Sequence, residues 1–330
     1  MSKRQVFITG VNGFIGQALT RRLQADGVTV VGVDANANQA EGIVAGDISK
    51  PGEWQDAIAG SDLVIHTAAV VSNAVDTETT WRVNVLGTRH VVDAAAAVGV
   101  PRLVHLSSVR AFSDLNYPDG VDERWPVRTD GNAYVDTKIA SEHVVLQAHA
   151  EGEISATIIR PGDVYGPGSR PWVILPLEAM ESGSFALPAS GNGVFSPIYV
   201  DDLVNGLLTA ADHPDAAGHI LTLTGPDTVT TAEYFGYLHR MLGRDGSPRS
   251  VPTTAAVGYA AIFSTVARLL RKSTEVNPTT VRYLARTGGY SSEKARALVG
   301  YEPRVDLNEG MRRTEAWLRA EGLLHPSNDH

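Results

Sequence analysis

The sequence contains no cysteine, which excludes disulfides, zinc–thiolate sites and a cysteine nucleophile. Basic residues are also few: 28 Lys and Arg stand against 37 Asp and Glu, giving a net charge of −9. A nucleic-acid surface needs clustered lysine and arginine, so we expect no nucleic-acid partner. No apolar run is long enough to span a bilayer, and no secretory signal precedes the first predicted strand. We therefore expect a cytoplasmic protein without a metal site.

The length and composition predict a globular protein with more than one lobe. A chain of 330 residues is long for one compact core, and 43% of the residues are hydrophobic. These values suit a large α/β domain that carries a smaller lobe.

The most informative stretch is a glycine turn in VFITGVNGFIG, residues 6–16. A short apolar strand precedes it, a helix follows, and Gly10, Gly13 and Gly16 have the spacing G-x-x-G-x-x-G. Such glycines permit a sharp turn, let the backbone approach a pyrophosphate and let helix and strand pack closely. The helix N-terminus then faces the phosphates. Because the next strand, Val28–Val33, ends at Asp34, this context predicts a dinucleotide site.

Alternating strand and helix patterns continue to about residue 165 and predict a doubly wound parallel sheet of the Rossmann type. We expect a cofactor domain at 1–168, with a returning strand and helix near 196–212, and a mainly substrate-binding lobe at 169–330. The predicted strands are Ile43–Ala45, Asp62–Ile65, Arg102–Leu106 and Ala156–Arg160, and the long helices are Thr77–Val98 and Ala133–Ala150.

Several polar or small residues follow predicted strands, where ligands of open α/β sheets bind. Ala68 and Ala69 leave room for a cofactor to cross the sheet edge. Asp47 either contacts an adenine amino group or only makes a turn, and spacing alone does not separate these readings. His66 is a candidate base, but a buried structural histidine is the favoured interpretation. Asn84, within the predicted helix 77–98, is expected to make a structural hydrogen bond to backbone.

Tyr134 and Lys138 stand four residues apart, on one face of the helix that begins near Ala133. A free tyrosine has a pKa of ~10, so acid–base work near neutrality requires a lowering by roughly three units, or ~4 kcal/mol. Lys138, the helix N-terminus and an oxidised nicotinamide would all act in that direction. Ser108, at the end of a strand, can donate a hydrogen bond to the substrate oxygen.

Together these motifs resemble an extended short-chain dehydrogenase/reductase, of the NAD-dependent epimerase/dehydratase superfamily, along nearly the whole chain. The similarity is carried by TGVNGFIG, HTAA, NVLGT, the serine pair and YVDTK. Locally, RPGDVYGPG and SPIYVDDL are most similar to the 3β-hydroxysteroid dehydrogenase-like branch.

The resemblance implies a catalytic set of Ser108, Tyr134 and Lys138, in which Tyr134 exchanges the proton and Lys138 lowers its pKa. It also implies NAD as the cofactor, because Asp34 repels a 2′-phosphate and Ala35-Asn36 supplies no arginine. The resemblance places Asp34 on the adenosine ribose and Pro161 against the nicotinamide. The implied cofactor contacts are Gly10, Asn12, Gly13, Phe14, Ile15, Gly16, Asp34, Asp47, Ile48, Ala68, Ala69, Ser107, Tyr134, Lys138, Pro161 and Val164.

Departures from the sugar-nucleotide members of that family favour an apolar small-molecule substrate. Asp163 stands where those members usually carry asparagine, and its carboxylate would repel a diphosphate. The segment before VDD lacks their arginine, and Trp172, Ile174, Leu175, Phe185, Leu187 and Phe195 offer apolar walls. We predict interconversion of a secondary alcohol and a ketone, with 3β-hydroxysteroid-like molecules as one substrate class.

Two other functions remain open. Arg282 and Arg286 are potential phosphate partners, which keeps an NDP-sugar 4-epimerase or dehydratase as the alternative. A non-catalytic NAD-binding regulator is the third, although such proteins tend to lose the tyrosine or lysine.

Three further expectations concern surfaces and caps. The segment Thr254–Leu270 is apolar, with Arg268, Arg271 and Lys272 at its end. Three interpretations are open: a core helix, a mobile lid, or a helix at a membrane interface. Asp201 and Asp202 are expected to cap the helix Leu203–Ala211 rather than to bind metal. In related enzymes the helices corresponding to 77–98 and 133–150 pair into a four-helix bundle, so we expect a homodimer.

Overall fold

The computed structural model describes residues 4–35, 42–113, 118–270 and 274–324. Its centre is a seven-stranded parallel sheet in the order β10-β6-β5-β4-β1-β2-β3. The inner strands are buried along their length, as expected when helices cover both faces. This arrangement confirms the predicted fold class. The strands are β1 (Gln5–Thr9), β2 (Thr29–Asp34), β3 (Ile43–Ala45), β4 (Leu63–His66), β5 (Arg102–Leu106), β6 (Ser155–Pro161) and β10 (Ile220–Leu223).

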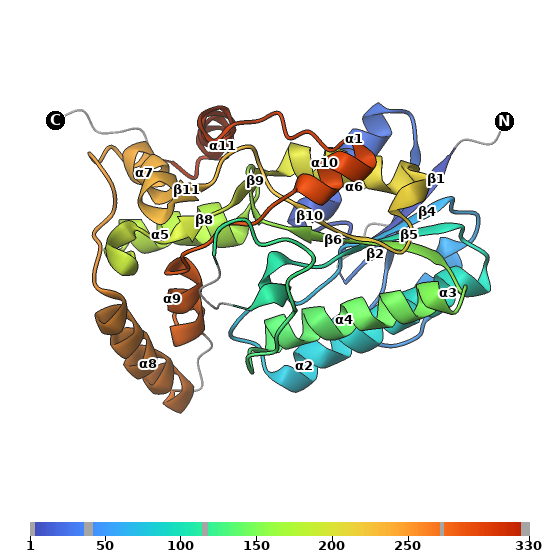
Figure 1. Ribbon diagram of the computed structural model, residues 1–330, viewed down its shortest axis with the longest axis horizontal. Helices are drawn as coiled ribbons and strands as arrows, with labels where there is room; N and C mark the ends of the chain where they lie inside the picture. Colours follow the sequence, from blue (N-terminus) through green and yellow to red (C-terminus); the bar gives the residue numbers. More distant parts are fainter. Residues whose placement is uncertain (1–3, 36–41, 114–117, 271–273, 325–330) are drawn as a thin grey trace.

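Helices cover both faces of this sheet (Figure 1). On one face lie α1 (Phe14–Ala25), α6 (Val200–Asp212) and α10 (Glu293–Val299). On the other lie α2 (Thr77–Trp81), α3 (Gly87–Ala97) and α4 (Ala133–Ala150). The predicted helix 77–98 is continuous but contains a π-helical segment, η3 (Arg82–Leu86). Short 3₁₀ turns are η2 (Glu53–Ile58), η4 (Val109–Phe112), η6 (Ala189–Gly191) and η7 (Pro214–Ala216).

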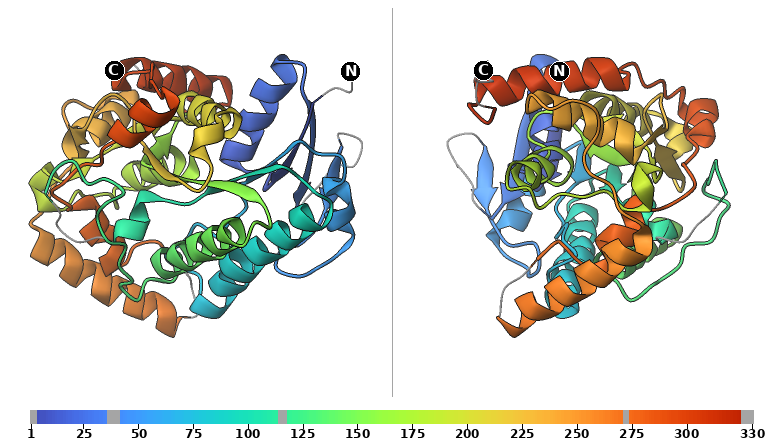
Figure 2. Two further views of the ribbon diagram at one scale, coloured as in Figure 1. Left: turned by 45° about the vertical axis from the view of Figure 1, so that its right-hand side comes forward. Right: turned by 90° about the vertical axis from the view of Figure 1, so that its left-hand side faces the viewer.

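A second group of elements stands beyond the carboxyl ends of the strands (Figures 1 and 2). It contains the π-helical turn η5 (Arg170–Ile174), α5 (Leu175–Glu181), α7 (Thr231–Met241), α8 (Thr253–Leu269), α9 (Pro278–Leu284) and α11 (Leu307–Ala320). Two small sheets join it to the main one: β7 (Asp163–Tyr165) with β9 (Pro197–Tyr199), and β8 (Val194–Phe195) with β11 (Val229–Thr230).

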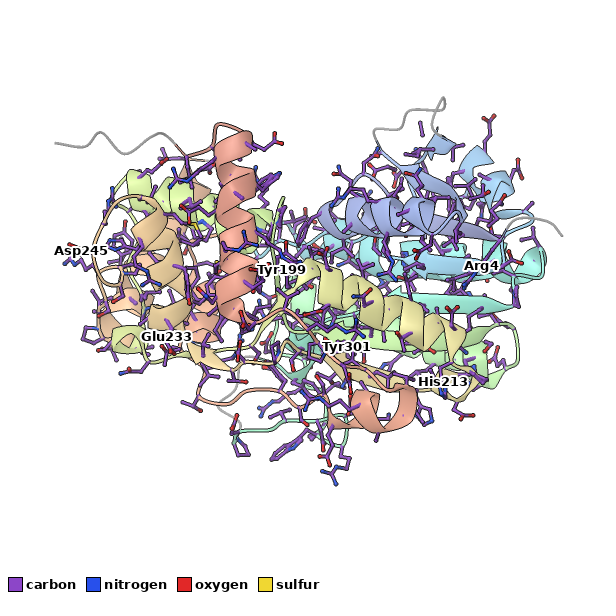
Figure 3. The ribbon with its side chains drawn as sticks, turned by 90° about the horizontal axis from the view of Figure 1, so that it is seen from above. Arg4, Tyr199, His213, Glu233, Asp245 and Tyr301 are labelled. Carbon is purple, nitrogen blue, oxygen red and sulfur yellow. The ribbon has the colours of Figure 1, made fainter. Side chains whose placement is uncertain are left out.

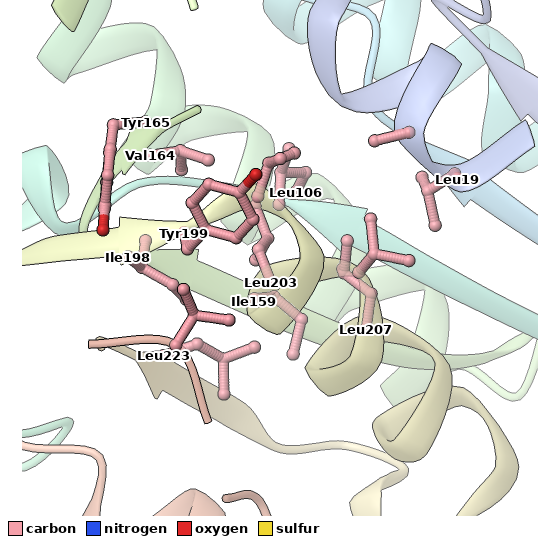
Figure 4. Close-up of a cluster of buried hydrophobic side chains, with 14 of the residues drawn as sticks. Leu19, Leu106, Ile159, Val164, Tyr165, Ile198, Tyr199, Leu203, Leu207 and Leu223 are labelled. Atoms are coloured by element: carbon pink, nitrogen blue, oxygen red, sulfur yellow. The ribbon is translucent and has the colours of Figure 1, made fainter. Parts of the chain in front are cut away.

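One hydrophobic core continues from the main sheet into this second group. Leu106 and Ile159 of the sheet belong to the same buried cluster as Tyr165, Ile198 and Leu203 (Figure 4). Tyr199 lies where α6 meets α11, and the guanidinium carbon of Arg313 is 5.6 Å from its ring centre (Figure 3). The two groups are therefore packed together rather than only linked by loops.

The expected return of the chain near 196–212 differs in one respect. Helix α6 packs on the main sheet, but β9 pairs with β7 in a separate two-stranded sheet, and β10 is the strand that joins β6. The reason is local: Asp163 N donates to Ser196 O at 2.8 Å, and Ser196 N donates to Asp163 Oδ2 at 3.0 Å. These bonds hold the short β9 against β7.

The predicted capping role of Asp201 and Asp202 is wrong. The residue before the first turn of α6 is Tyr199, and it makes no side-chain cap. Asp202 instead accepts hydrogen bonds from the backbone N–H groups of Arg304 and Val305, at 3.0 and 2.9 Å, so it anchors a distant segment. Among the described residues no group of acidic and histidine side chains is arranged to hold a metal ion.

The interpretation of the apolar segment 254–270 as a core helix is also wrong. In α8 the buried positions are alanines, Ala260 and Ala267, whereas Ile262 and Leu269 are 70% and 79% exposed. The basic residues Arg271 and Lys272 lie outside the described part of the chain, as does Asn36. Within the described residues, every helix falls short of the length and apolar character that crossing a bilayer requires.

Candidate functional site

The glycine turn lies in a crevice between β1 and β4. The chain proceeds from β1 towards β2 on one side and returns to β4 on the other, which makes this the topological switch point of the sheet. Gly10 has φ +69°, and a Cβ there would stand 2.9 Å from Ala68 Cα. Any side chain at this position would therefore close the crevice and strain the turn.

The start of α1 is kept close to this turn. A Cβ on Gly16 would stand 2.2 Å from Gly10 O, so only glycine permits the approach. Asn12 N donates to Asp34 Oδ2 at 3.0 Å, which ties the turn to the end of β2. The first N–H groups of a helix have no partner within it and face an anion placed at this end. The turn, the helix start and Asp34 thus fit the pyrophosphate and ribose of a dinucleotide.

The remaining predicted cofactor residues lie around the same end of the sheet. Asp47 is exposed, accepts a bond from Ser49 N at 3.0 Å and so makes a turn, whereas Ile48 is buried. Pro161 ends β6 and Val164 lies in β7, both buried. Their contacts with the cofactor stay predictions.

His66 is a buried structural residue in this structure. Thr88 Oγ1 donates to Asn84 O at 2.7 Å, so His66 Nε2 donates to Thr88 at 2.9 Å. His66 Nδ1 then accepts from Thr9 Oγ1 at 2.6 Å. Burial lowers its pKa to about 3, with a smaller effect from the charge of Lys138. Neither ring nitrogen is available as a base, in agreement with the favoured interpretation.

Three predicted catalytic side chains converge at the end of β5 and the first turns of α4. Ser108 is close enough to Tyr134 to act on the pKa of its phenol in the lowering direction. Lys138 Nζ donates to Leu106 O at 2.7 Å, the last residue of β5. Helix α4 begins where predicted because Asn132 Oδ1 accepts bonds from the N–H groups of its first turn.

The electrostatics of these groups follow from their burial. Burial raises the pKa of Tyr134, while the hydrogen bond with Ser108 and the charge of Arg110 act in the lowering direction. Burial lowers the pKa of Lys138 to about 8, and the carboxylate of Glu142 opposes this change. The predicted lowering of the Tyr134 pKa also involves the nicotinamide, so it stays a prediction.

Sequence reasoning missed Glu142, which connects three elements behind the site. Glu142 is 2% exposed and accepts a hydrogen bond from Ser107 Oγ at 2.5 Å. It also accepts hydrogen bonds from Arg160 Nε and Nη2, at 2.8 and 2.6 Å. The sequence did contain an indication of this role. Glu142 stands four residues after Lys138, and side chains at i and i+4 share a helix face. The Ser107 hydroxyl is therefore engaged with protein rather than directed only at a cofactor.

A second buried ion pair joins Asp163 of β7 to Arg286, after α9. Arg286 Nη2 bonds Asp163 Oδ2, and the hydroxyl of Tyr283 donates to Oδ1. The side chains are 1% and 3% exposed. Burial disfavours the charged form of Arg286, yet the adjacent carboxylate of Asp163 holds its pKa above the ordinary value. Arg286, predicted as a potential phosphate partner, is thus neutralised inside the protein, whereas Arg282 is exposed.

The predicted apolar walls divide into two groups. Leu187 and Phe195 are fully buried and belong to the core. Phe195 packs against Tyr234, with ring centres 4.3 Å apart. Trp172 and Phe185 are only partly buried and remain candidates to line a substrate pocket.

A glycine turn at the switch point of a parallel sheet, with Asp34 after the second strand, defines the class of dinucleotide-binding α/β proteins. Comparison with known proteins gives the family. Residues 6–223 match the model of the NAD dependent epimerase/dehydratase family, and the chain belongs to that family. It is an NAD-dependent enzyme of the extended short-chain dehydrogenase/reductase type, as the resemblance implied.

Relatives and solved structures agree with this assignment. The 2-alkyl-3-oxoalkanoate reductase of Stenotrophomonas maltophilia is 30% identical, over 94% of this chain and 98% of that protein. The decarboxylating sterol-4-alpha-carboxylate 3-dehydrogenase of Mus musculus is 25% identical, over 93% and 89%. The structure of MoeE5 with UDP-glucose and NAD is 23% identical and superposes with a TM-score of 0.75, over 96% and 99%. At that identity the last comparison supports the fold.

Proposed function

We propose that the protein interconverts a secondary alcohol and a ketone on an apolar substrate, using Ser108, Tyr134 and Lys138. NAD supplies the hydride acceptor for the oxidation and, when reduced, the hydride donor for the reverse reaction. In the oxidation Tyr134 takes the hydroxyl proton, and in the reduction it returns a proton to the carbonyl oxygen. Ser108 orients that oxygen, and Lys138 favours the ionised phenol.

The observation that carries the choice of substrate is the buried pair of Asp163 and Arg286. A nucleotide diphosphate requires positive charge where it binds. Here the guanidinium is already paired and almost completely buried, with no net charge left for a phosphate. The relatives named for 2-alkyl-3-oxoalkanoates and sterol-4-alpha-carboxylates support a substrate that joins hydrocarbon to a 3-oxo or 3-hydroxy group.

A panel of substrates tests this proposal. NADH formation or consumption would be followed with 3β-hydroxysterols, 2-alkyl-3-oxoalkanoates, simple secondary alcohols, UDP-glucose and UDP-galactose. We expect turnover with one of the apolar classes. Epimerisation of a UDP-sugar without net NADH would instead establish the alternative, for which Arg282, the other predicted phosphate partner, is exposed. Binding of NAD with no turnover across the panel would establish the regulator.

The catalytic set is tested with Tyr134→Phe. Because general acid–base catalysis contributes about 10²–10⁴-fold, we expect at least a hundredfold loss of turnover with NAD binding retained. Tyr237→Phe in α7, which removes the hydroxyl of a half-buried tyrosine outside the proposed catalytic set, is the control and should keep wild-type turnover. Wild-type turnover in Tyr134→Phe would refute the assignment.

We also propose a homodimer. Trp81, the last residue of α2, and Leu86, the last residue of η3, are 42% and 46% exposed, and α3 packs beside α4. Large apolar side chains in this position suit packing against a second copy. Light scattering after size exclusion should give twice the chain mass, and Trp81→Ser with Leu86→Ser should give the monomer. A monomeric wild type at micromolar concentration would contradict the proposal.

A further inference from the structure

Glu275, between α8 and α9, reaches the loop that follows β4. Ser72 Oγ donates to its Oε1, and Asn73 N donates to its Oε2 at 3.1 Å. Both carboxylate oxygens are therefore engaged by one loop, about 200 positions earlier in the sequence. The Glu275 side chain is half-buried, so water competes with Ser72 and Asn73 for its carboxylate. The contact therefore forms only when the loop is held close to Glu275.

Asn73 extends this contact to the catalytic helix. Its Nδ2 donates to Thr280 Oγ1 in α9 at 3.2 Å, and its Oδ1 accepts from Asn132 Nδ2 at 3.0 Å. Asn132 Oδ1 in turn accepts from Tyr134 N at 3.0 Å and from Val135 N at 3.1 Å. A continuous chain of hydrogen bonds thus runs from Glu275 to the backbone of Tyr134.

A second contact fixes the same loop to α4. Asn84 Oδ1 accepts from Val70 N at 2.7 Å, and its Nδ2 donates to Val70 O and to Thr137 Oγ1, both at 3.1 Å. These bonds to Val70 confirm the expected structural hydrogen bond of Asn84 to backbone. The loop is therefore held at Val70 by Asn84 and at Asn73 by Glu275 and Asn132.

We propose that Glu275 is a positioning residue for Tyr134, acting through Asn73 and Asn132. The inference rests on the proposed role of Tyr134. Glu275 and Thr280 belong to the substrate side of the molecule, and Tyr134 to the cofactor side. The chain of bonds therefore couples the position of α9 to the first turn of α4. That turn sets where the phenol oxygen stands relative to Ser108.

Glu275→Ala tests the coupling by two readouts. We expect kcat to fall about tenfold, with KM for NAD unchanged, because small displacements of a catalytic group are costly. Hydrogen exchange at the amides of Tyr134 and Val135 should become faster, because their acceptor is no longer fixed. Glu302→Ala, which removes an exposed carboxylate from another part of the chain, is the control and should change neither quantity.

A double-mutant cycle separates positioning from a merely structural effect. If Glu275 acts through the cap, Glu275→Ala combined with Asn132→Ala should be no slower than Asn132→Ala alone. Additive losses, a change confined to the substrate KM, or unchanged exchange at Tyr134 would each overturn the proposal. The exchange readout needs no turnover. An inactive wild type would therefore count against the proposed function, and unchanged exchange against this inference.

Discussion

The ion pair of Asp163 and Arg286 allows a stability prediction that depends on tertiary structure alone. Asp163→Asn keeps the shape of the side chain but removes its charge. The guanidinium of Arg286, 3% exposed, is then left without its counter-ion. Among the described residues its Nε and Nη1 have no other hydrogen-bond acceptor. The variant therefore retains a buried and uncompensated cation.

The size of the effect follows from that burial. Removing one partner of a buried ion pair costs about 3–5 kcal/mol, against a typical total stability of about 5–15 kcal/mol. At about 2.1 cal/mol/K per residue, 330 residues give an unfolding entropy of about 0.7 kcal/mol/K. We therefore expect Tm to fall by about 4–7 °C.

Thermal unfolding followed by circular dichroism measures this change, with urea unfolding as a second method. Glu315→Gln, which breaks the exposed pair with Arg319, is the matched control and should cost less than about 1 kcal/mol. The double variant Asp163→Leu with Arg286→Met should recover only part of the loss. An apolar pair avoids the desolvation of two charges, but Ser196 N and the Tyr283 hydroxyl lose their acceptor. If Asp163→Asn unfolds within 1 °C of the wild type, the buried cation is not uncompensated and the reasoning fails.

Three other predictions use the same reasoning. Gly16→Ala should abolish NAD binding measured by calorimetry, because the new Cβ would stand 2.2 Å from Gly10 O. Unchanged affinity for NAD would contradict the conclusion that this turn fits the pyrophosphate. His66, with a pKa lowered from 6.5 to about 3, binds fewer protons folded than unfolded, so stability should be lost as pH falls from about 6.5 to 3. His66→Gln should flatten that acid dependence in urea titrations, and an equally steep curve would exclude His66 as its cause. The kcat for ketone reduction should decline as pH rises through about 8, where Lys138 loses its proton. Glu142→Gln should move that decline to lower pH, because it removes the charge that raises the Lys138 pKa. A pH profile of kcat that does not move in the variant would argue against this coupling.

Local sequence chemistry predicted the sheet and the glycine turn correctly. Buried parallel strands read as short apolar runs, and a turn that needs positive φ needs glycine, so residues 5–34 were interpretable in isolation. The helix containing Tyr134 and Lys138 was predicted to begin near Ala133, and it does, because an i, i+4 pair is a local feature.

Other features were decided by pairings between distant segments. Asp163 and Arg286 are 123 positions apart, and their pairing converted a potential phosphate partner into a neutralised core residue. Asp202 stands where a cap is expected but bonds residues 304 and 305. Helix α8 has an apolar composition typical of a core, and only its packing through alanines shows that its large side chains face outwards.

The sequence by itself determined where the backbone turns, which segments are buried strands and that Tyr134 and Lys138 share one face of a helix. These properties depend on steric limits and periodicity within a few residues. Only the tertiary structure decided which charges are paired, which apolar side chains are covered and which loop holds the catalytic helix. Those outcomes depend on which distant segments come into contact when the sheet assembles. Local periodicity in the sequence does not specify these contacts.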